Sequence, residues 1–425
     1  MKVFINNLNG LNKTKEVIMS KVLERFLNYV KFDTQSKEES ETYPSTEGQK
    51  VFAEFLKNEL ISIGMKEVEV DEYSYVFATI PSNIEKDLPP LGFMAHMDTA
   101  PNMNGKNVNP RVIENYDGKD IILNEKENII LSPKLFPEIL KFVGKSIVVT
   151  DGTTLLGVDD KGGVAEIITA MEYLINHPEI KHGKIRVCFT PDEEIGKGVE
   201  HLDPNKFGVK FAFTIDGGPI GELQYENFNA AKAVIEINGV DIHPKEAKNK
   251  MKNSILIANE LINMLPPSER PEHTEGYEGF FHIITFNGSI EKTNLYFIIR
   301  DFFKESFEKR KNLMKKLTEI LNFKYGEGTV NLKIEDTYFN MKEIVEPHIE
   351  LIEIAKKSME EVGVVPKIVP IRGGTDGARL SYKGIPTPNI GVGGYNYHGR
   401  YEYIPVESLE KNVELIVKIC NLWPK

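Results

Sequence analysis

The stretch KSIVVTDGTTLLGVDDKGGVAEIITAMEYLI, residues 145–175, contains the pattern that decides the fold. KSIVVT is a short apolar run, typical of a buried strand. The loop after it carries two adjacent acids, Asp159 and Asp160, followed by a lysine and two glycines. Apolar side chains then recur at helical spacing from Val164 to Ile175. A strand, a polar loop and a helix in succession indicate an α/β layer with a largely parallel sheet.

The same pattern extends to both sides of this stretch. Buried strands are predicted for LGFMAH at residues 91–96, KIRVCFT at 184–190 and KFAFTI at 210–215. Apolar residues at helical spacing predict amphipathic helices at 15–30 and 48–63. Together these elements predict one large α/β domain.

Between residues 228 and 340 the pattern changes. The order there is strand, helix, strand, strand, helix, strand, which is that of a ferredoxin-like α+β module. We therefore expect a discontinuous large α/β domain, residues 1–227 and 341–425, with a mostly parallel mixed sheet. Residues 228–340 would form a smaller inserted domain.

The composition excludes several classes of protein. Of the 425 residues 41% are hydrophobic and 27% are charged, as in soluble globular proteins. The net charge of −11 argues against a nucleic-acid binder, which needs a basic face. No apolar run approaches the roughly 18 residues that span a bilayer. The N-terminal stretch has no apolar signal region, and only Cys188 and Cys420 occur, so we expect a cytoplasmic protein.

Acidic or histidine-bearing motifs follow the predicted strands at the point where each strand ends. They are His96-Met97-Asp98, Asp159-Asp160-Lys161-Gly162-Gly163, Asp192-Glu193-Glu194-Ile195-Gly196 and Asp216-Gly217-Gly218, and His398 follows a further apolar stretch, PTPNIGV. Because ligands of open α/β sheets bind beyond the carboxyl ends of the strands, these motifs are expected to meet in one crevice.

Carboxylates gathered in this way repel one another, and a pair of divalent cations would compensate them. Imidazole and carboxylate ligands suit zinc, and a two-metal site needs one carboxylate that bridges the ions. Adjacent acids such as Glu193 and Glu194 can divide the work, one binding metal and the other acting as general base.

Each motif also has a purely structural explanation. The His96 motif can be an ordinary surface or core element, and the Asp159 motif can cap a helix. The Glu193 motif can be a solvated loop and His398 a turn residue. These explanations leave the shared position at strand ends unexplained, so we favour the metal site.

Several longer motifs resemble one known family. GFMAHMDTAP, TDGTTLLGVDDKGGVAEI, VCFTPDEEIGKG, TIDGGP, HTEGYEGF, YFIIRDF, PIRGGTDGARLS and NYHGRYEY are similar to those of the peptidase T family of tripeptide aminopeptidases. That family belongs to the wider two-zinc exopeptidases, which include carboxypeptidase G and the aminoacylases. The resemblance covers residues 23–419 and leaves a leader of about twenty residues outside it.

The resemblance implies a role for each motif. The five positions that match the family's ligands for two zinc ions are His96, Asp159, Glu194, Asp216 and His398. Asp159 would be the bridging carboxylate and Glu193 the general base. Asp98 would orient His96, as carboxylates commonly do for histidine ligands.

The resemblance also implies substrate contacts in the inserted domain and near the C-terminus. His243 matches a lid histidine that polarises the scissile carbonyl, and Arg300 and Arg372 match positions that hold polar groups of the substrate. Lys245-Glu246 departs from the family's glycine and small residue, which leaves the placement of His243 open. The alternatives are a surface histidine at a helix start and, for Arg300, an ion pair with Asp301 or a nearby acid.

The function expected from the sequence is therefore removal of the N-terminal residue from tripeptides. A dipeptide, an N-acyl amino acid or a C-terminal residue are alternative substrates for the same chemistry. A non-catalytic binding protein is the alternative from another class, and an intact ligand set with Glu193 present argues against it. The expected partners are small peptides, with neither nucleic acid nor membrane. A homodimer through the inserted domain is compatible with its exposed sheet edge.

Overall fold

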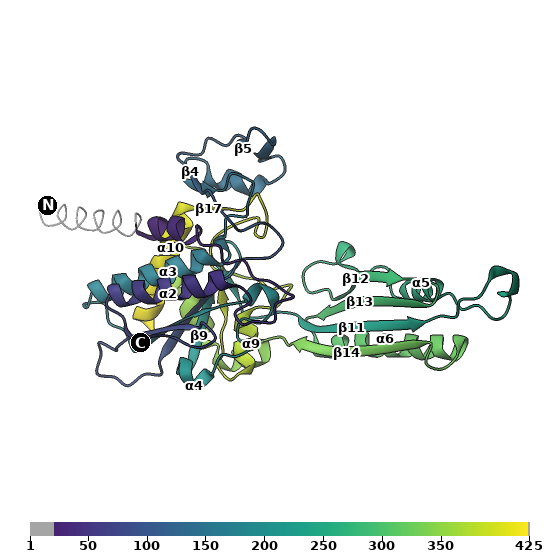
Figure 1. The fold of residues 1–425 in the computed structure, drawn as a ribbon. Helices are drawn as coiled ribbons and strands as arrows, with labels where there is room; N and C mark the ends of the chain where they lie inside the picture. Colours follow the sequence, from purple (N-terminus) through teal and green to yellow (C-terminus); the bar gives the residue numbers. More distant parts are fainter. Residues whose placement is uncertain (1–20, 424–425) are drawn as a thin grey trace, which may run out of the picture. The chain divides into compact units, whose positions relative to one another are not determined.

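A computed structural model describes residues 21–423 of the chain. These residues form two compact units (Figure 1). The first comprises residues 21–225, 344–369 and 375–423, and the second comprises residues 226–343 and 370–374. The short segment 370–374 thus belongs to the second unit although it lies well beyond it in the sequence. No helix among the described residues is long and apolar enough to cross a bilayer.

The first unit is built on a mixed sheet of eight strands. In spatial order they are β1 (Lys66–Val70), β2 (Val76–Ile80), β8 (Ile185–Thr190), β3 (Leu91–His96), β9 (Phe211–Ile215), β16 (Asn389–Ile390), β10 (Glu222–Gln224) and β15 (Lys367–Ile368). The central neighbours β8, β3, β9 and β16 run parallel, whereas β1, β2 and β10 bring antiparallel pairings to the two sides. The carboxyl ends of the central strands therefore lie side by side at the same end of the sheet.

Helices cover both faces of this sheet, which is why its central strands read as continuous apolar runs. Every residue of β3 is buried. The helix α3 (Val158–Asn176) packs on β3 and β9. On another part of the sheet, α4 (Pro204–Phe207) contacts β8 and α9 (Asp376–Tyr382) contacts β9.

The remaining helices of the first unit are amphipathic and border this core. They are α2 (Glu47–Ser62), α7 (Lys342–Val345, which begins in the second unit), α8 (Glu350–Glu361) and α10 (Val406–Leu422), with the 3-10 turns η1 (Pro137–Phe142), η2 (Glu193–Ile195) and η5 (Glu346–His348). Residues 21–29 are also helical, as the predicted helix at 15–30 requires. The part of that prediction before residue 21 lies outside the described residues.

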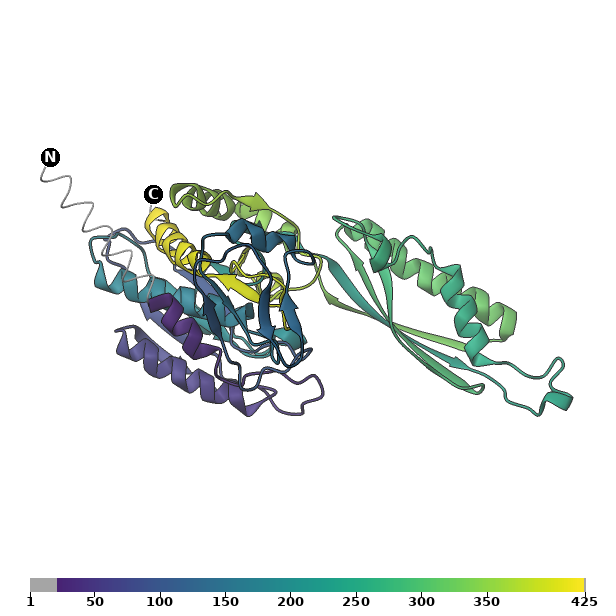
Figure 2. The ribbon, with the colours of Figure 1, turned by 90° about the horizontal axis from the view of Figure 1, so that it is seen from above.

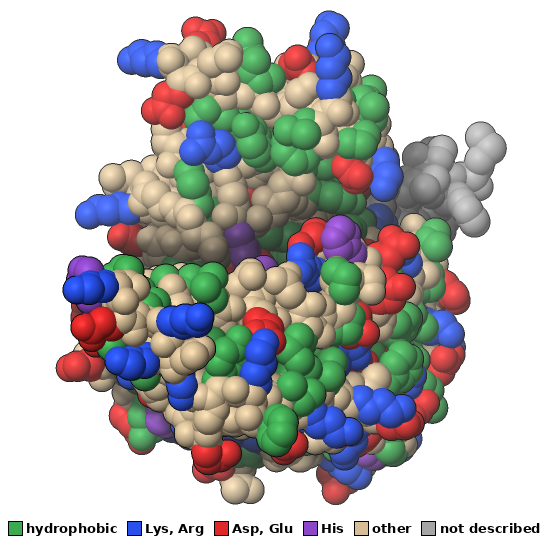
Figure 3. All heavy atoms as spheres, turned by 90° about the vertical axis from the view of Figure 1, so that its right-hand side faces the viewer, with side chains coloured by type: hydrophobic (Ala, Val, Ile, Leu, Met, Phe, Trp, Pro, Cys, Tyr) green, Lys and Arg blue, Asp and Glu red, His purple; other side chains and the backbone are tan. Residues whose placement is uncertain are grey.

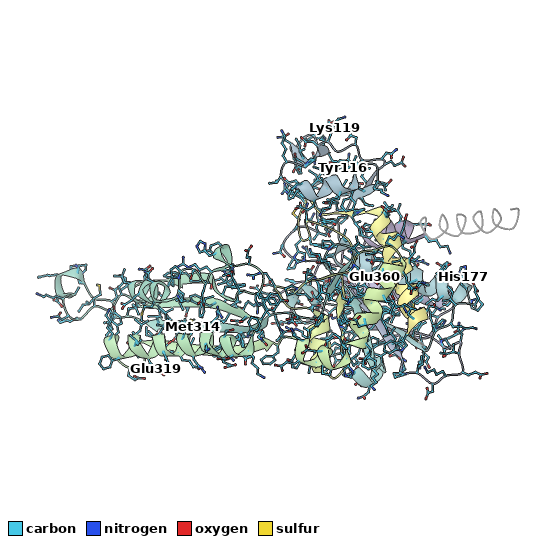
Figure 4. The ribbon with its side chains drawn as sticks, turned by 180° about the vertical axis from the view of Figure 1, so that it is seen from behind. Tyr116, Lys119, His177, Met314, Glu319 and Glu360 are labelled. Carbon is cyan, nitrogen blue, oxygen red and sulfur yellow. The ribbon has the colours of Figure 1, made fainter. Side chains whose placement is uncertain are left out.

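The strand KSIVVT has a different place from the one that its sequence suggests. It forms β7 (Ile147–Val149), which pairs with β4 (Arg111–Ile113) and β17 (Tyr403–Pro405) in a separate three-stranded sheet. With the hairpin β5 (Ile121–Asn124) and β6 (Ile129–Leu131), this sheet makes a small lobe of the first unit. Figure 4 shows Tyr116 in the lobe, where it is buried, and Lys119 at its periphery.

The second unit has the strand and helix order expected from the sequence. Its antiparallel sheet consists of β12 (Phe280–Gly288), β13 (Lys292–Asp301), β11 (Asn229–Asn238) and β14 (Val330–Tyr338). The helices α5 (Ser254–Met264) and α6 (Lys304–Tyr325) lie on one face of that sheet (Figure 2). Met314 of α6 is buried against the sheet, whereas Glu319 is exposed (Figure 4). The unit also contains the turns η3 (Pro244–Glu246) and η4 (Pro271–His273).

The surface carries charges of both signs. Ion pairs such as Lys232 with Glu335 and Lys292 with Glu236 join neighbouring strands of the second unit. The face in Figure 3 shows acidic and basic side chains interspersed rather than gathered into one field.

Candidate metal centre

The ends of three neighbouring parallel strands supply most of the candidate site. His96 is the last residue of β3, Asp216 directly follows β9, and the Glu193-Glu194 pair lies in η2, just beyond β8. Because β8, β3 and β9 are adjacent and parallel, their carboxyl ends bring these side chains to one place.

Asp159 arrives by a different path. The strand before it, β7, lies outside the main sheet, so Asp159 does not extend from a central strand as the sequence suggested. A long loop instead carries it to the start of α3, where Gly157 has the left-handed φ of +86°. Asp159 and Asp160 have non-helical dihedral angles and a cis peptide bond joins them.

Asp159 lies between the two histidines. Its Oδ1 is 2.9 Å from Nε2 of His96, and its Oδ2 is 3.1 Å from Nε2 of His398. His398 Nε2 is also 3.1 Å from Oε1 of Glu194, and His96 Nε2 is 3.7 Å from Oδ1 of Asp216. The two oxygens of one carboxylate thus face two different imidazoles, which is the arrangement that a bridging ligand requires.

The donor atoms are close enough to hold cations. One atom from each of His96, Asp159 and Glu194 can be chosen so that all lie within 4.8 Å of one another, and the same holds for His96, Asp160 and Asp216. Imidazole and carboxylate donors fit zinc and related divalent ions. The residues present therefore fit a metal centre of the kind expected from the sequence.

Asp160 is the acid that sequence reasoning did not select. Its Oδ2 accepts a hydrogen bond from the backbone N–H of His96 at 3.1 Å, and its Oδ1 accepts one from Gly163 at 3.3 Å. Both oxygens thus hold backbone groups of the site. Adjacent acids give no signal in the sequence that separates such a backbone acceptor from a metal ligand.

Asp98 connects the histidine with the glutamate pair. Its Oδ1 is 3.4 Å from Nδ1 of His96, and the same side chain accepts hydrogen bonds from the backbone N–H groups of Glu193 and Glu194, at 3.0 and 3.2 Å. The backbone oxygen of Asp98 lies closer to Nδ1 of His96, at 3.1 Å, so the orienting role of the carboxylate stays a prediction. The contacts with η2 were not expected, and they fix the glutamate loop relative to β3.

The electrostatics of the centre are those of crowded acids. Burial raises the pKa of Glu193 well above its ordinary value, and burial together with the charge of Asp159 raises the pKa of Glu194 to about 7. Contacts with Asp159 and Glu194 raise the pKa of His398 to about 11. Burial and crowding thus shift the two glutamates toward their protonated forms and His398 toward its cation, which shows how strongly this place favours positive charge.

The remaining predicted residues lie in the second unit. His243 is exposed at the start of η3, and its Nδ1 accepts a hydrogen bond from the N–H of Lys245 at 3.2 Å. The guanidinium of Arg300 lies over the ring of Tyr338, 4.8 Å from its centroid. Asp301, the acid proposed as its alternative partner, pairs with Arg310.

Arg372 has a well-defined set of partners within the second unit. It donates to the carbonyl oxygens of Gly276 and Glu278, at 2.7 and 3.1 Å, and to the carbonyl and hydroxyl oxygens of Thr274, at 3.3 and 3.0 Å. Its guanidinium lies over Phe228, 5.1 Å from the ring centroid. These bonds hold the HTEGYEGF loop, a role that the sequence did not suggest.

Comparison with known proteins identifies the family of the chain. A model of Peptidase family M20/M25/M40 matches residues 146–421. The chain is 62% identical over 405 residues to peptidase T of Halothermothrix orenii, an alignment that covers 95% of this chain and 99% of that protein. It is 58% identical over 407 residues to peptidase T of Caldanaerobacter subterraneus, covering 96% of this chain and 100% of the relative.

Solved structures include the same fold. The crystal structure of aminopeptidase PepT from Bacillus cereus superposes with a TM-score of 0.76 at 26% sequence identity, covering 96% of this chain and 99% of that one. The mixed α/β architecture is thus that of these peptidases. From the family match and the near full-length similarity, the chain belongs to peptidase family M20/M25/M40 and is a peptidase, similar throughout to the proteins named peptidase T.

Proposed function

We propose that this peptidase removes the N-terminal residue from tripeptides with the help of two zinc ions. The ligands would be His96, Asp159, Glu194, Asp216 and His398. The observation that carries the proposal is the position of the Asp159 carboxylate, with one oxygen at His96 and the other at His398. The N-terminal specificity and the tripeptide substrate are supported by the similarity to peptidase T and to aminopeptidase PepT.

The bound ions would polarise the scissile carbonyl and lower the pKa of a water toward roughly 7. Glu193 would take the proton of that water and later give it to the departing amine. Asp98 would keep His96 and the Glu193-Glu194 loop in a fixed relation while the proton moves.

The two parts of the chain would have separate tasks. Residues 1–227 and 341–425 would form the catalytic domain, and residues 228–340 a lid that also mediates dimerisation. His243 would stabilise the oxyanion, and Arg300 and Arg372 would contribute to the substrate site. We further infer a cytoplasmic homodimer.

The test combines metal content with the choice of bond. Purified protein is examined by elemental analysis and incubated with a tripeptide, the dipeptide formed from its first two residues, the N-acetylated tripeptide and the tripeptide amide. We expect close to two metal ions per chain and release of the N-terminal residue from the free tripeptide. Products are identified by mass spectrometry.

The same experiment separates the alternatives. Release of the C-terminal residue would indicate a carboxypeptidase, and hydrolysis of the N-acetyl group an aminoacylase. Preference for the dipeptide would indicate a dipeptidase. Any of these outcomes would contradict the proposal, as would tripeptide cleavage at full rate after complete removal of metal.

A further inference from the structure

The buried carboxylate of Glu402 contacts the backbone of Asp159 in the candidate metal centre. Glu402 is 1% exposed. Its Oε2 accepts hydrogen bonds from the backbone N–H groups of Leu156 and Gly157, at 2.7 and 2.8 Å. Its Oε1 accepts from Val158 at 2.8 Å and from Asp159 at 3.3 Å. One side chain thus receives four consecutive N–H groups from a segment nearly 250 residues away in the sequence.

The segment 156–159 is shaped to receive an anion. Gly157 has a left-handed φ of +86°, so the N–H groups around it converge on one point. The residue before α3 is this glycine, which has no side chain to cap the helix. Glu402 takes the place of that cap. Since the site is buried, loss of the carboxylate would leave these N–H groups without an acceptor.

Glu402 and His398 lie in the same hydrogen-bonded loop. Residues 395–403 form a loop closed by two backbone hydrogen bonds between Tyr395 and Tyr403, at 2.9 and 3.1 Å. His398 lies within this loop with a left-handed φ of +62°, and the N–H of Glu402 donates to Gly399 at 3.2 Å. A fixed loop therefore carries both the imidazole that faces Asp159 and the carboxylate that holds the backbone of Asp159.

We propose that Glu402 is a positioning residue that fixes the Asp159 carboxylate relative to His398 and so sets the metal affinity of the centre. This inference rests on the proposed function, because it takes Asp159 and His398 as metal ligands. Both oxygens of Glu402 are engaged by backbone N–H groups. It acts through the backbone of one ligand and the loop of another.

Glu166 supplies the matched control. It is fully buried in α3, seven residues after Asp159, and one of its oxygens accepts a hydrogen bond from Asn412 at 3.0 Å. Glu166→Gln therefore changes a buried carboxyl group on α3, the helix that contains Asp159, without altering a contact of the segment 156–159. A general effect of altering a buried acid would appear in both variants, whereas a positioning effect would appear only at Glu402.

The experiment measures metal binding in wild type, Glu402→Gln, Glu402→Asp and Glu166→Gln. Affinity for Zn²⁺ is determined by competition with a chelator, and the visible absorption of the Co²⁺-loaded proteins reports the geometry around the metal. Glutamine offers one acceptor oxygen in place of two, so Glu402→Gln should lower the affinity of at least one site about 10- to 100-fold and change the Co²⁺ spectrum. Glu166→Gln should have the Zn²⁺ affinity and the Co²⁺ spectrum of wild type.

Glu402→Asp keeps the negative charge, but its shorter side chain places the carboxylate farther from the N–H groups. Its loss of metal affinity should therefore be smaller than that of Glu402→Gln. Folding of each variant is checked by urea unfolding without metal. If Glu402→Gln does not fold, Glu402→Asp is judged by the same measurements.

The outcomes separate the two proposals. If wild type binds two ions and a folded Glu402 variant binds them with unchanged affinity and spectrum, the positioning role is overturned while the proposed function stands. Failure of both Glu402 variants to fold would also overturn it, because the carboxylate would then serve the fold as a whole. If wild type itself binds no metal, the proposed function fails and this inference with it.

Discussion

At the scale of single residues, Asp159 has the most constrained position in the candidate centre. Its two oxygens face His96 and His398, and its backbone N–H donates to Glu402. Burial opposes a charged carboxylate there, but the contacts with the two histidines prevail and lower the pKa of Asp159. The side chain is thus held as an anion between two imidazoles.

The adjacent glutamates provide the first prediction. Glu193→Gln should keep the metal content of wild type and lose about 10²-fold or more in kcat, the usual scale for loss of a general base. Glu194→Gln should lose metal, because Oε1 of Glu194 lies at His398 within the ligand cluster. Elemental analysis and steady-state kinetics on a tripeptide check both variants. Reversed phenotypes would mean that the two roles have been exchanged.

Arg372 provides a second prediction at this scale. Lysine cannot reproduce four donated bonds from one planar group, so Arg372→Lys should loosen the segment 274–278. Hydrogen exchange followed by mass spectrometry should show faster exchange in that segment. Arg300→Lys is the control, since the guanidinium of Arg300 lies over Tyr338 instead. Equal exchange in wild type and Arg372→Lys would show that the loop is held by other contacts.

At the scale of elements, buried strands were the most predictable part. LGFMAH coincides with β3, because strands covered on both faces are apolar throughout. The run KSIVVT is equally apolar, yet β7 belongs to another sheet. An apolar run shows that a strand is buried but not which sheet buries it. The sequence therefore predicted that Asp159 lies near His96, as it does, but not the loop that carries it there.

Other features were invisible in the sequence for a related reason. Asp160 and Glu402 act through backbone N–H groups, and any backbone can supply those. An acid that accepts hydrogen bonds from backbone N–H groups requires no particular residue type as its partner, so the amino-acid sequence does not reveal the contact. The side chains expected to bind metal could be selected because zinc restricts its ligands to a few residue types. The structure brings His96 together with Asp159 and Glu194 in one group of possible ligands, and with Asp160 and Asp216 in another.

The contact between α3 and the main sheet provides a third prediction. A Cβ at Gly163 would lie 2.2 Å from the carbonyl oxygen of Ile215 and 2.6 Å from Oδ1 of Asp160. Because the first is a backbone atom, Gly163→Ala must displace α3 from the end of β9 and should cost about 1–3 kcal/mol of unfolding free energy. Asp216 follows Ile215, so metal affinity should fall too.

Gly373→Ala is the control for this variant, because the nearest atom to its Cβ is 4.0 Å away. Its unfolding free energy should stay within about 0.5 kcal/mol of wild type. Both values come from urea unfolding followed by circular dichroism. A Gly163→Ala protein as stable as wild type would show that the helix can shift at little cost.

At the scale of the whole molecule, metal should stabilise the first unit selectively. Its candidate centre gathers carboxylates that repel one another when no cation is bound. An ion present at about 100 times its Kd adds about 2.7 kcal/mol to the stability of the state that binds it. Removal of metal with a chelator should therefore lower the melting temperature of the first unit, measured by calorimetry. The melting temperature of the second unit should stay the same. Identical melting with and without metal would contradict this.

The second unit has a fold that favours association. The edge strand β12 carries exposed apolar side chains, Ile284 at 45% and Phe286 at 42%. Exposed strand edges of this kind pair readily with another chain. His243 is exposed in the loop that follows β11. Under the proposed homodimer, His243 of one chain would act in the candidate metal centre of the other.

Subunit mixing tests that sharing. His243→Ala should reduce kcat much more than it raises KM, since the oxyanion exists only in the transition state. Glu193→Gln should be nearly inactive for lack of its base. When the two variants exchange subunits at equal amounts, half of the dimers are mixed, and each mixed dimer has one site with both residues intact. About a quarter of wild-type activity should then return. If exchange is demonstrated by mass spectrometry of differently tagged chains and no activity returns, each chain uses its own His243 or the residue has no part in the reaction.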